Sequence, residues 1–311
     1  MKILISAPYM HKEKEKVMGY FKNFPAEIVW ADVCERLEES DLLSIITPFD
    51  GIICGDDRFT PKVFDQAKNL KVIVKWGTGI DSIDQDYAKK SGVKLYRTPN
   101  AFTDPVADST LAFMLGFSRN LFPNDELMKN GNWDKPQGFA LFEKTVGIIG
   151  YGRIGQAVAA RLRPFGSTVL AYDIDPDKSK SEYSRQGATI ASLSEIVEYS
   201  DMITLHCDLN QTSHHLLNTA LFNKMKKMPI IINTARGPII NESDLILALQ
   251  EGKVSGAGLD VFEHEPLPTD SPLRQMKNVL LSSHNTNSSP YSWDFVHRNS
   301  IKMLKDGLKI Q

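Results

Sequence analysis

Short apolar runs alternate with charged segments of helical composition over residues 2 to 96. Each run is four or five residues long at most, and between the runs the segments His11–Lys22 and Pro61–Asn69 have the spacing of amphipathic surface helices. This alternation is typical of βα units, in which successive strands join one parallel sheet. The predicted strands are Lys2–Ser6, Glu27–Trp30, Gly51–Cys54, Val72–Lys75 and Lys94–Tyr96.

The same alternation returns after a turn-forming stretch at residues 98–103 and a long helix that opens at Asp104-Pro105. Pro123 is expected to kink or end this helix, because proline lacks a backbone N–H and clashes with the preceding turn. Six further strands are then predicted, enough for a complete doubly wound sheet. They are Thr145–Gly150, Thr168–Asp173, Met202–His206, Ile230–Asn233, Gly256–Asp260 and Val279–Leu281.

The predicted fold class is therefore α/β with two domains. Residues 99–284 are expected to form a Rossmann-type domain with a doubly wound parallel sheet. Residues 1–98 and 285–311 are expected to form a smaller, flavodoxin-like α/β domain. The amphipathic segment Tyr291–Leu308 is too short to be a domain and should pack back on the first strands. A chain of 311 residues, 42% of them hydrophobic, can fill two cores.

A glycine-rich turn joins the first strand of the larger domain to the following helix. Gly150, Gly152 and Gly155 form G-x-G-x-x-G in the strand–turn–helix context of dinucleotide sites. The first glycine permits the turn, the second lets a pyrophosphate approach, and the third lets the helix pack on the strand. Asp173 follows Gly155 by 18 residues (173 − 155) at the end of the next strand. A purely structural turn would not explain this carboxylate, which suits the ribose hydroxyls of NAD and repels the 2′-phosphate of NADP.

Charge and cysteine content argue against several classes of function. A net charge of −2 gives no reason to expect nucleic acid or an anionic membrane as a partner. Cys34, Cys54 and Cys207 lack metal-ligand spacing, so no disulfide framework or metal centre is predicted and a cytoplasmic location is expected. No apolar run is long enough to span a bilayer. The adjacent pair His214-His215 is interpreted as surface, because neighbouring side chains point apart.

Several motifs resemble the D-isomer-specific 2-hydroxyacid dehydrogenases and occur in that family's order over nearly the whole chain. They are Lys75–Asp81, Asn100-Ala101, Val106–Thr110, the glycine-rich turn, Asn233–Gly237, Gly258–Pro266 and His284. The resemblance implies an NAD-dependent, phosphoglycerate dehydrogenase-like enzyme that transfers a hydride between nicotinamide and a small-molecule D-2-hydroxy acid or 2-keto acid. It also implies a homodimer in which residues 99–284 of each chain bind NAD and residues 1–98 and 285–311 form the substrate-binding domain. The family's catalytic arginine, glutamate and histidine map onto Arg236, Glu265 and His284.

The chemistry of that set agrees with the residue types. A 2-hydroxy acid loses its hydroxyl proton to a base, and histidine serves because its pKa lies near neutrality. A glutamate beside the ring orients it and favours imidazolium. The planar guanidinium of arginine grips a carboxylate bidentately and can polarise a keto oxygen. Taken singly, Arg236 and Glu265 would suit a structural ion pair and His284 a surface position, so the prediction depends on their combination.

Binding residues are also implied by the resemblance. The cofactor-binding set is Thr110, Gly150, Gly152, Arg153, Ile154, Gly155, Asp173, His206, Thr234, Ala235 and Asp260, with Asp260 expected to meet the nicotinamide carboxamide. The substrate-binding set is Lys75, Trp76, Gly77, Asn100 and Arg236. The turn that begins at Trp76 is rich in glycine, and such turns present backbone N–H groups to anions.

Two alternatives remain at this point. His206 is a rival to His284 as the base, although the family has no catalytic role at that position. The same fold also serves NAD-sensing, corepressor-like binding proteins, against which the intact Arg236, Glu265 and His284 argue.

The chain departs from the family's pattern around the predicted base and at Lys75. Ser282-Ser283 replaces the usual Thr-Pro or Ser-Pro, and Asn285–Ser289 replaces a glycine-containing run, which leaves the pose of His284 open. Lys75 stands where phosphoglycerate-type relatives carry arginine. A cation there predicts a polar or phosphorylated substrate tail, unless Lys75 points to solvent.

Overall fold

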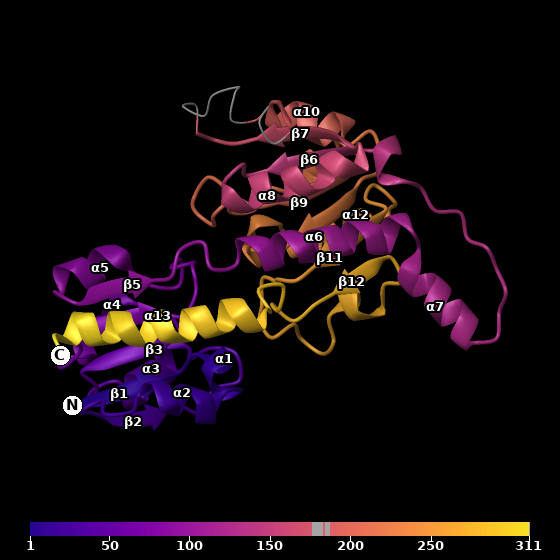
Figure 1. Cartoon of the computed structure of the whole chain (residues 1–311). Helices are drawn as coiled ribbons and strands as arrows, with labels where there is room; N and C mark the ends of the chain where they lie inside the picture. The colour runs from indigo at the N-terminus through magenta and orange to yellow at the C-terminus, as the bar shows by residue number, and fades with distance from the viewer. Residues whose placement is uncertain (176–182, 184–186, 311) are drawn as a thin grey trace. The chain divides into compact units, whose positions relative to one another are not determined.

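The computed structural model describes residues 1–175, 183 and 187–310, which form two compact units (Figure 1). Unit 1 comprises Met1–Phe102 and Ser288–Gln311, and unit 2 comprises Thr103–Asn287. The units end at residues 102 and 287, whereas the predicted domains end at 98 and 284. Each unit is built on its own parallel sheet, and the mixed α/β class predicted from the sequence is confirmed.

The sheet of unit 1 has five parallel strands in the order β2-β1-β3-β4-β5, which is the flavodoxin-like order. Its strands are β1 (Lys2–Ile5), β2 (Glu27–Trp30), β3 (Gly51–Cys54), β4 (Val72–Lys75) and β5 (Lys94–Arg97). The two central strands β3 and β4 are buried along their whole length, which explains their continuous apolar runs. The chain reverses its order between β1 and β3, where ligands of such sheets bind.

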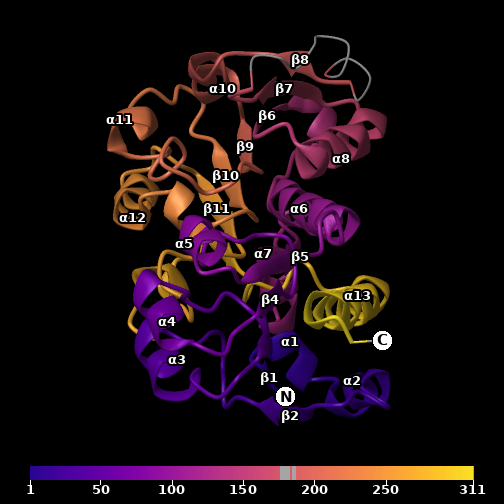
Figure 2. The ribbon, with the colours of Figure 1, turned by 90° about the vertical axis from the view of Figure 1, so that its left-hand side faces the viewer.

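Helices cover both faces of this sheet. They are α1 (Pro8–His11), α2 (Lys14–Tyr20), α3 (Glu39–Ile45), α4 (Pro61–Gln66), α5 (Gln85–Lys90) and α13 (Pro290–Leu308). Figure 2 shows α3 and α4 on one face, with α2 and α13 on the other. The predicted single helix His11–Lys22 is wrong, because α1 ends at His11 and Glu13, at φ −119° and ψ 32°, separates it from α2.

The helix α13 packs closely on the sheet of unit 1 because glycine stands at two contact points. A side chain at Gly51 would place its Cβ 2.9 Å from Leu304 Cδ1, and one at Gly307 would place it 2.7 Å from Val72 Cγ2. Lys94 Nζ also donates to the carbonyl of Gly307 at 2.8 Å. Residues 288 to 310 are therefore an integral part of the first unit's core.

Unit 2 contains a seven-stranded parallel sheet in the order β12-β11-β10-β9-β6-β7-β8. Its strands are β6 (Thr145–Ile149), β7 (Thr168–Tyr172), β8 (Thr189–Ile190), β9 (Met202–Leu205), β10 (Ile230–Asn233), β11 (Gly256–Leu259) and β12 (Val279–Leu281). Six of these were predicted, and the two-residue edge strand β8 was missed. The order reverses between β6 and β9, which is the switch point of a Rossmann sheet.

The helices of unit 2 also lie on both faces of the sheet, with α6 and α8 on one side and α10, α11 and α12 on the other (Figure 2). They are α6 (Thr103–Ser118), α7 (Leu121–Lys129), α8 (Arg153–Leu162), α10 (Leu193–Tyr199), α11 (Thr219–Phe222) and α12 (Glu242–Gln250). Short 3₁₀ turns occur at Leu141–Glu143, Arg163–Phe165, Gly237–Ile239 and Pro272–Gln275.

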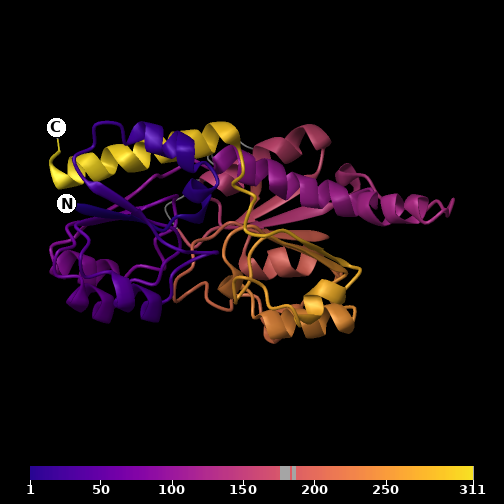
Figure 3. The same cartoon turned by 90° about the horizontal axis from the view of Figure 1, so that it is seen from below.

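The long helix of unit 2 breaks before Pro123, so the predicted position of the break is wrong. The helix α6 ends at Ser118, and Asn120 adopts a left-handed conformation with φ 48°. Pro123 lies in the first turn of α7. Proline is tolerated there, because the backbone N–H groups of a helix's first turn have no partner within the helix. Figure 3 shows α7 extending away from the sheet of its own unit. Among the described residues, no helix has both the length and the apolar character needed to cross a membrane.

Candidate active site

The glycine-rich turn lies at the switch point of the sheet in unit 2, between β6 and α8. A Cβ on Gly150, which has φ +92°, would lie 2.3 Å from the backbone nitrogen of Cys207, and one on Gly155 would lie 2.2 Å from the carbonyl of Gly150. A Cβ on Gly152 would meet no atom within 4 Å. Gly150 and Gly155 are therefore required by the protein itself, whereas Gly152 leaves space at the start of α8. A pyrophosphate bound at a helix N-terminus needs such an open approach to the backbone.

Asp173 is tied to the same turn. Its Oδ2 accepts from the backbone N–H of Tyr151 at 2.7 Å, and its Oδ1 accepts from that of Asp175 at 3.0 Å. The predicted cofactor residues Arg153 and Ile154 are the first two residues of α8. The carboxylate, the turn and the helix N-terminus thus form one group, which is the donor and acceptor set that a dinucleotide needs.

His206 follows β9 directly beside the turn, and its backbone N–H donates to Ile149 at 2.7 Å. Burial lowers the pKa of His206 to about 3, so the ring is neutral at physiological pH. Its Nε2 lies 3.0 Å from Thr204 Oγ1, and its buried Nδ1 has no hydrogen-bond partner among the described residues. A histidine whose pKa lies so far below neutral pH is a poor proton-transfer group, and this disfavours His206 as the base.

Arg236 is held by the turn that follows β10. The side chain of Asn233 braces this turn, since it donates to the carbonyl of Arg236 at 2.8 Å and accepts from the N–H of Ala235 at 3.0 Å. Gly237 presses the turn against the loop after β11, because a Cβ there would lie 1.9 Å from the carbonyl carbon of Phe262. The guanidinium is half-buried and donates to Ala235 at 2.8 Å.

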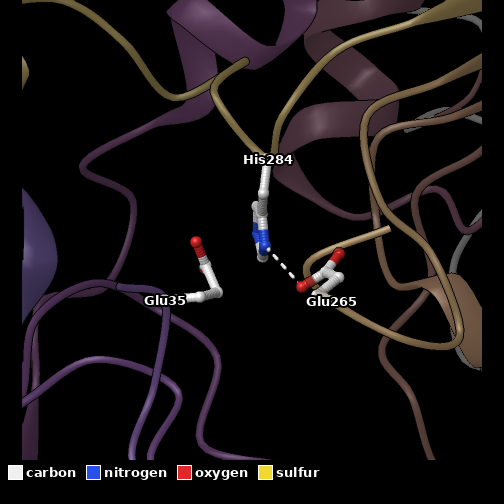
Figure 4. Close-up of side chains that lie close together, drawn as sticks. All are labelled: Glu35, Glu265 and His284. Atoms are coloured by element: carbon white, nitrogen blue, oxygen red, sulfur yellow. Dashed lines mark hydrogen bonds and ion pairs between the residues drawn. The ribbon is translucent and has the colours of Figure 1, made fainter. Parts of the chain in front are cut away.

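Glu265 and His284 form a pair at the end of the sheet (Figure 4). His284 Nδ1 lies 3.1 Å from Glu265 Oε2, and the two side chains are 17% and 13% exposed. The second carboxylate oxygen accepts from the N–H of Phe262 at 3.0 Å, which fixes the plane of the carboxylate. With Nδ1–H donating to Glu265, Nε2 is the ring atom that can exchange a proton with substrate.

Asp260 holds the backbone on which His284 stands. It is fully buried, and its carboxylate accepts from the N–H of Asn285 at 2.8 Å and from the N–H and hydroxyl of Thr286 at 3.1 and 2.5 Å. Its carbonyl accepts from the N–H of His284 at 2.8 Å. His284 itself has φ 49°, a conformation that a non-glycine residue keeps only when its surroundings impose it. Asp260 thus fixes the backbone of residues 284 to 286, which include the start of the run that departs from the family's pattern.

Thr110 and Thr234 connect α6 to the turn after β10. The hydroxyls lie 3.2 Å apart, and Thr110 Oγ1 also approaches the carbonyl of Val106 at 2.8 Å. Both residues are buried. The predicted cofactor residues Thr110 and Thr234 are therefore brought together, and Asp260 follows the neighbouring strand.

Two predicted substrate residues of unit 1 are buried. Lys75 is 3% exposed, and its Nζ lies 3.2 Å from Asp56 Oδ1, so it does not point to solvent. Trp76 is 1% exposed. Its ring stacks on Tyr9 with centroids 4.4 Å apart, and its Nε1 donates to His297 Nδ1 at 2.8 Å. The indole belongs to the core of unit 1, which leaves the backbone of this turn as the part that can meet a ligand.

The other two predicted substrate residues of unit 1 lie in turns after β4 and β5. Gly77 has φ +121°, a conformation reserved in practice for glycine, and its carbonyl accepts from the N–H of Thr98 at 2.8 Å. Asn100 has φ 64°, in the left-handed region that asparagine tolerates.

The interpretation of His214-His215 as side chains that point apart is wrong. The rings stack with centroids 4.0 Å apart, because His215 has φ 50°. His215 Nε2 lies 2.5 Å from Glu263 Oε1 and so joins this loop to the segment that carries Glu265. Nothing in the local sequence could have shown this contact, since its partners are 48 residues apart.

Comparison with known proteins agrees with this geometry. Residues 111–286 match the family described as D-isomer specific 2-hydroxyacid dehydrogenase, NAD binding domain. The chain is 39% identical over 251 residues to a glyoxylate reductase of Thermofilum pendens, which covers 78% of this chain and 74% of that protein. It is 37% identical over 260 residues to a hydroxypyruvate reductase of Thermotoga maritima, with 83% and 82% covered.

Solved structures show the same relationship over almost the full length. A D-lactate dehydrogenase of Aquifex aeolicus, complexed with NAD and lactic acid, aligns with a TM-score of 0.88 at 28% identity and covers 99% of this chain and 96% of that one. The fold and the site define an NAD-dependent oxidoreductase. The chain belongs to the D-isomer specific 2-hydroxyacid dehydrogenases and transfers a hydride between nicotinamide and a 2-hydroxy or 2-keto acid. The predicted enzyme class and cofactor are confirmed, and no observation supports the corepressor-like alternative.

Proposed function

We propose that the chain reduces small 2-keto acids of the glyoxylate and hydroxypyruvate type. The observation that carries the proposal is the pair of His284 and Glu265, with Nδ1 and Oε2 3.1 Å apart. Relatives named glyoxylate reductase and hydroxypyruvate reductase support the substrate class. A phosphorylated tail is the second candidate, since a relative named D-3-phosphoglycerate dehydrogenase is 35% identical over 287 residues, although the chain spans only 53% of that protein.

The proposed catalytic roles follow from the chemistry of the three residues. Arg236 holds the substrate carboxylate and polarises the keto oxygen, because its guanidinium keeps its charge and offers paired donors. His284 gives its Nε2 proton to that oxygen during reduction and takes a proton back during oxidation. Glu265 orients the ring and stabilises the imidazolium. Bound NADH supplies the hydride for reduction.

The proposed cofactor site is the glycine-rich turn with its neighbours. The open space at Gly152 and the N–H groups that begin α8 suit the pyrophosphate. Asp173 suits the ribose hydroxyls. The Nδ1 of His206, for which the described part of the chain provides no hydrogen-bond partner, offers one further polar atom beside the turn. Thr110, Thr234, Ala235 and Asp260 complete the cofactor set predicted from the sequence.

We further propose a homodimer and a reducing, cytoplasmic location. The apolar side chains of α7 and the segment after it are exposed, with Leu121 at 59%, Phe122 at 53%, Met128 at 47% and Trp133 at 77%. Four large apolar side chains exposed within 13 consecutive residues (121 to 133) suit an interface with a second copy of the chain. Light scattering tests the dimer. The parent should have twice the mass of one chain, and the double variant Leu121→Glu, Trp133→Glu should have the mass of a single chain. A parent with the mass of one chain, or a double variant that stays dimeric, would count against this interface.

The proposed location follows from the cysteines. Cys34, Cys54 and Cys207 are all free, which suits a reducing compartment.

A substrate screen tests the proposed reaction. Purified protein is mixed with NADH and one of glyoxylate, hydroxypyruvate, 3-phosphohydroxypyruvate or 2-ketoisocaproate, and the nicotinamide absorbance is followed. The highest kcat/KM is expected for glyoxylate or hydroxypyruvate. A preference for the phosphorylated acid would favour the second candidate, and a preference for the branched apolar acid would contradict both.

A further inference from the structure

Unit 1 buries a lysine at the carboxyl end of β4. The side chain of Lys75 is 4% exposed, and Nζ makes two contacts inside the unit. One is the ion pair with Asp56 Oδ1 at 3.2 Å, and the other is a hydrogen bond donated to the carbonyl of Trp76 at 3.3 Å. A buried ammonium needs such partners, because desolvation without them is costly. The cation is therefore engaged within the protein.

The contact with Trp76 fixes the direction of a neighbouring amide. The carbonyl of Trp76 and the N–H of Gly77 belong to one planar peptide, and in the trans form they point in opposite directions. A hydrogen bond from Lys75 to the carbonyl therefore also sets where the N–H of Gly77 points. The ammonium lies close to this turn, since a Cβ on Gly77 would be 3.9 Å from Nζ.

The turn offers a row of amide donors. Among the described residues, none accepts a hydrogen bond from the N–H groups of Gly77, Thr78 or Gly79. The carbonyls of the turn are engaged, since that of Gly77 accepts from Thr98 N–H at 2.8 Å and that of Thr78 accepts from Arg97 Nη1 at 3.1 Å. Gly77 is buried, and a buried N–H without a partner is rare unless a ligand supplies one. Consecutive amides of this kind suit a carboxylate.

We propose that Asp56 and Lys75 are positioning residues for this turn. Asp56 holds the ammonium, the ammonium holds the Trp76 carbonyl, and the Gly77 N–H is thereby aimed at the substrate carboxylate. Lys75 does not itself bind a phosphorylated tail. The inference deepens the proposed function and rests on it, because it assumes that a 2-keto acid is the substrate.

The test compares two ion pairs on the same two strands. Lys75→Met and Asp56→Asn remove the pair at the carboxyl ends of β4 and β3. Lys71→Met is the matched control, because it removes an ion pair just before the amino ends of the same strands. There Lys71 Nζ lies 2.8 Å from Asp50 Oδ1, and the side chain of Lys71 is 61% exposed. Each variant is assayed with glyoxylate, hydroxypyruvate and 3-phosphohydroxypyruvate, and oxalate serves as a carboxylate competitor.

Lys75→Met is expected to raise KM for each keto acid, and Ki for oxalate, by about 10-fold while kcat changes much less, because a ground-state contact is weakened. Asp56→Asn should shift the same quantities in the same direction, and Lys71→Met should behave like the parent. Lys75→Gln keeps a donor without the charge and should lie between the parent and Lys75→Met. NADH affinity, which tests unit 2, should stay at the parent value in every variant.

Three outcomes would overturn the inference. Unchanged KM and Ki in Lys75→Met would show that the ammonium does not set the turn. A loss confined to 3-phosphohydroxypyruvate would make Lys75 a phosphate ligand instead. Equal effects of Lys75→Met and Lys71→Met would point to general stability. A parent that turns over none of the acids would overturn the proposed function, and calorimetric binding of oxalate to the parent and to Lys75→Gln would still decide the role of Lys75.

Discussion

Both units place polar residues at the carboxyl ends of parallel strands, but they use them differently. In unit 1 these side chains satisfy one another, as Ser6 does with Asp57 and Asp56 with Lys75. In unit 2 the buried groups brace backbone turns, and the half-buried His284 stands on such a turn. Unit 1 therefore leaves backbone amides to meet a ligand, whereas unit 2 presents charged and titratable side chains.

Each unit also contains, near the carboxyl ends of its strands, a titratable group whose pKa is shifted by burial in the direction that favours its neutral form. Burial raises the pKa of Asp57 in unit 1 to about 6, although the hydrogen bonds from Ser6 and Leu37 oppose the shift. Burial lowers the pKa of His206 in unit 2 to about 3. The shifts have opposite signs because desolvation disfavours whichever form is charged. The pKa of His206 lies too far below neutral pH for proton transfer, and Asp57 is fully buried with its oxygens bonded to Ser6 and Leu37. Both observations support His284 as the proposed acid–base residue.

The largest expected effect is the loss of the base in unit 2. His284→Ala should lower kcat by about 10²- to 10⁴-fold, which is the range for a lost proton-transfer residue. NADH affinity and thermal unfolding should change little. His214→Ala is the control, because it removes another histidine of the same unit that lies outside the proposed site. Near-normal turnover of glyoxylate by the His284 variant would show that the base has been assigned to the wrong residue.

A second expected effect concerns stability and comes from the buried acid of unit 1. Its folded pKa of about 6 lies above the ordinary 3.8, so between these values the folded state keeps a proton that the unfolded state releases. Stability contributed by protonated Asp57 is thus present at low pH and lost as pH rises. The amide side chain in Asp57→Asn does not ionise. The free energy of unfolding of this variant, relative to that of the parent, should therefore rise by roughly 2–3 kcal/mol between pH 4 and pH 7.

Denaturant unfolding at several pH values measures this difference. Asp50→Asn serves as the contrast, because the hydrogen bond from Lys71 lowers the pKa of Asp50. Its carboxylate stabilises the fold above the ordinary carboxyl pKa, so its removal should cost stability at neutral pH and less in acid. If Asp57→Asn gained nothing with rising pH, the carboxyl of Asp57 would be ionised in the folded protein.

The smallest of these effects concerns the glycine-rich turn of unit 2, where substitution of different glycines should have different consequences. Gly152→Ala should fold normally, since its Cβ meets nothing within 4 Å, but it should weaken NADH binding at least about 10-fold by occupying the pyrophosphate space. Gly150→Ala should instead destabilise the unit, because its Cβ would lie 2.3 Å from backbone. Gly19→Ala on α2 also meets nothing within 4 Å and is the neutral control. Unchanged NADH affinity in Gly152→Ala would place the pyrophosphate elsewhere.

Much of the fold could be predicted because buried parallel strands are continuous apolar runs. The runs at Gly51–Cys54 and Ile230–Asn233 became strands with the predicted bounds. The edge strand Thr189–Ile190 has only two residues, both exposed, and so has no apolar run to detect. The break at Asn120 escaped prediction because a left-handed residue leaves a weaker trace in sequence than a proline.

Motifs in the sequence were sufficient to name the candidate catalytic residues, but not the contacts that support them in the structure. Asp260 binds Thr286 from 26 residues away, and Lys75 lies against Asp56 from the adjacent strand. These pairs are set by strand order and by the length of each loop, which a local pattern does not contain. Lys75 was accordingly predicted to be a ligand or a solvent-facing cation, and neither prediction foresaw its buried partner.

The close packing of α13 on the sheet of unit 1 affects the order in which the two units can fold during synthesis on the ribosome. Residues 103–287 are contiguous, so unit 2 can complete its core as soon as they have emerged. The strands of unit 1 emerge first, yet their sheet lacks the cover of Leu304 and Gly307 until residues 288–310 follow. Domains generally fold from the N-terminus onward during synthesis, but this connectivity predicts that unit 2 completes its fold before unit 1.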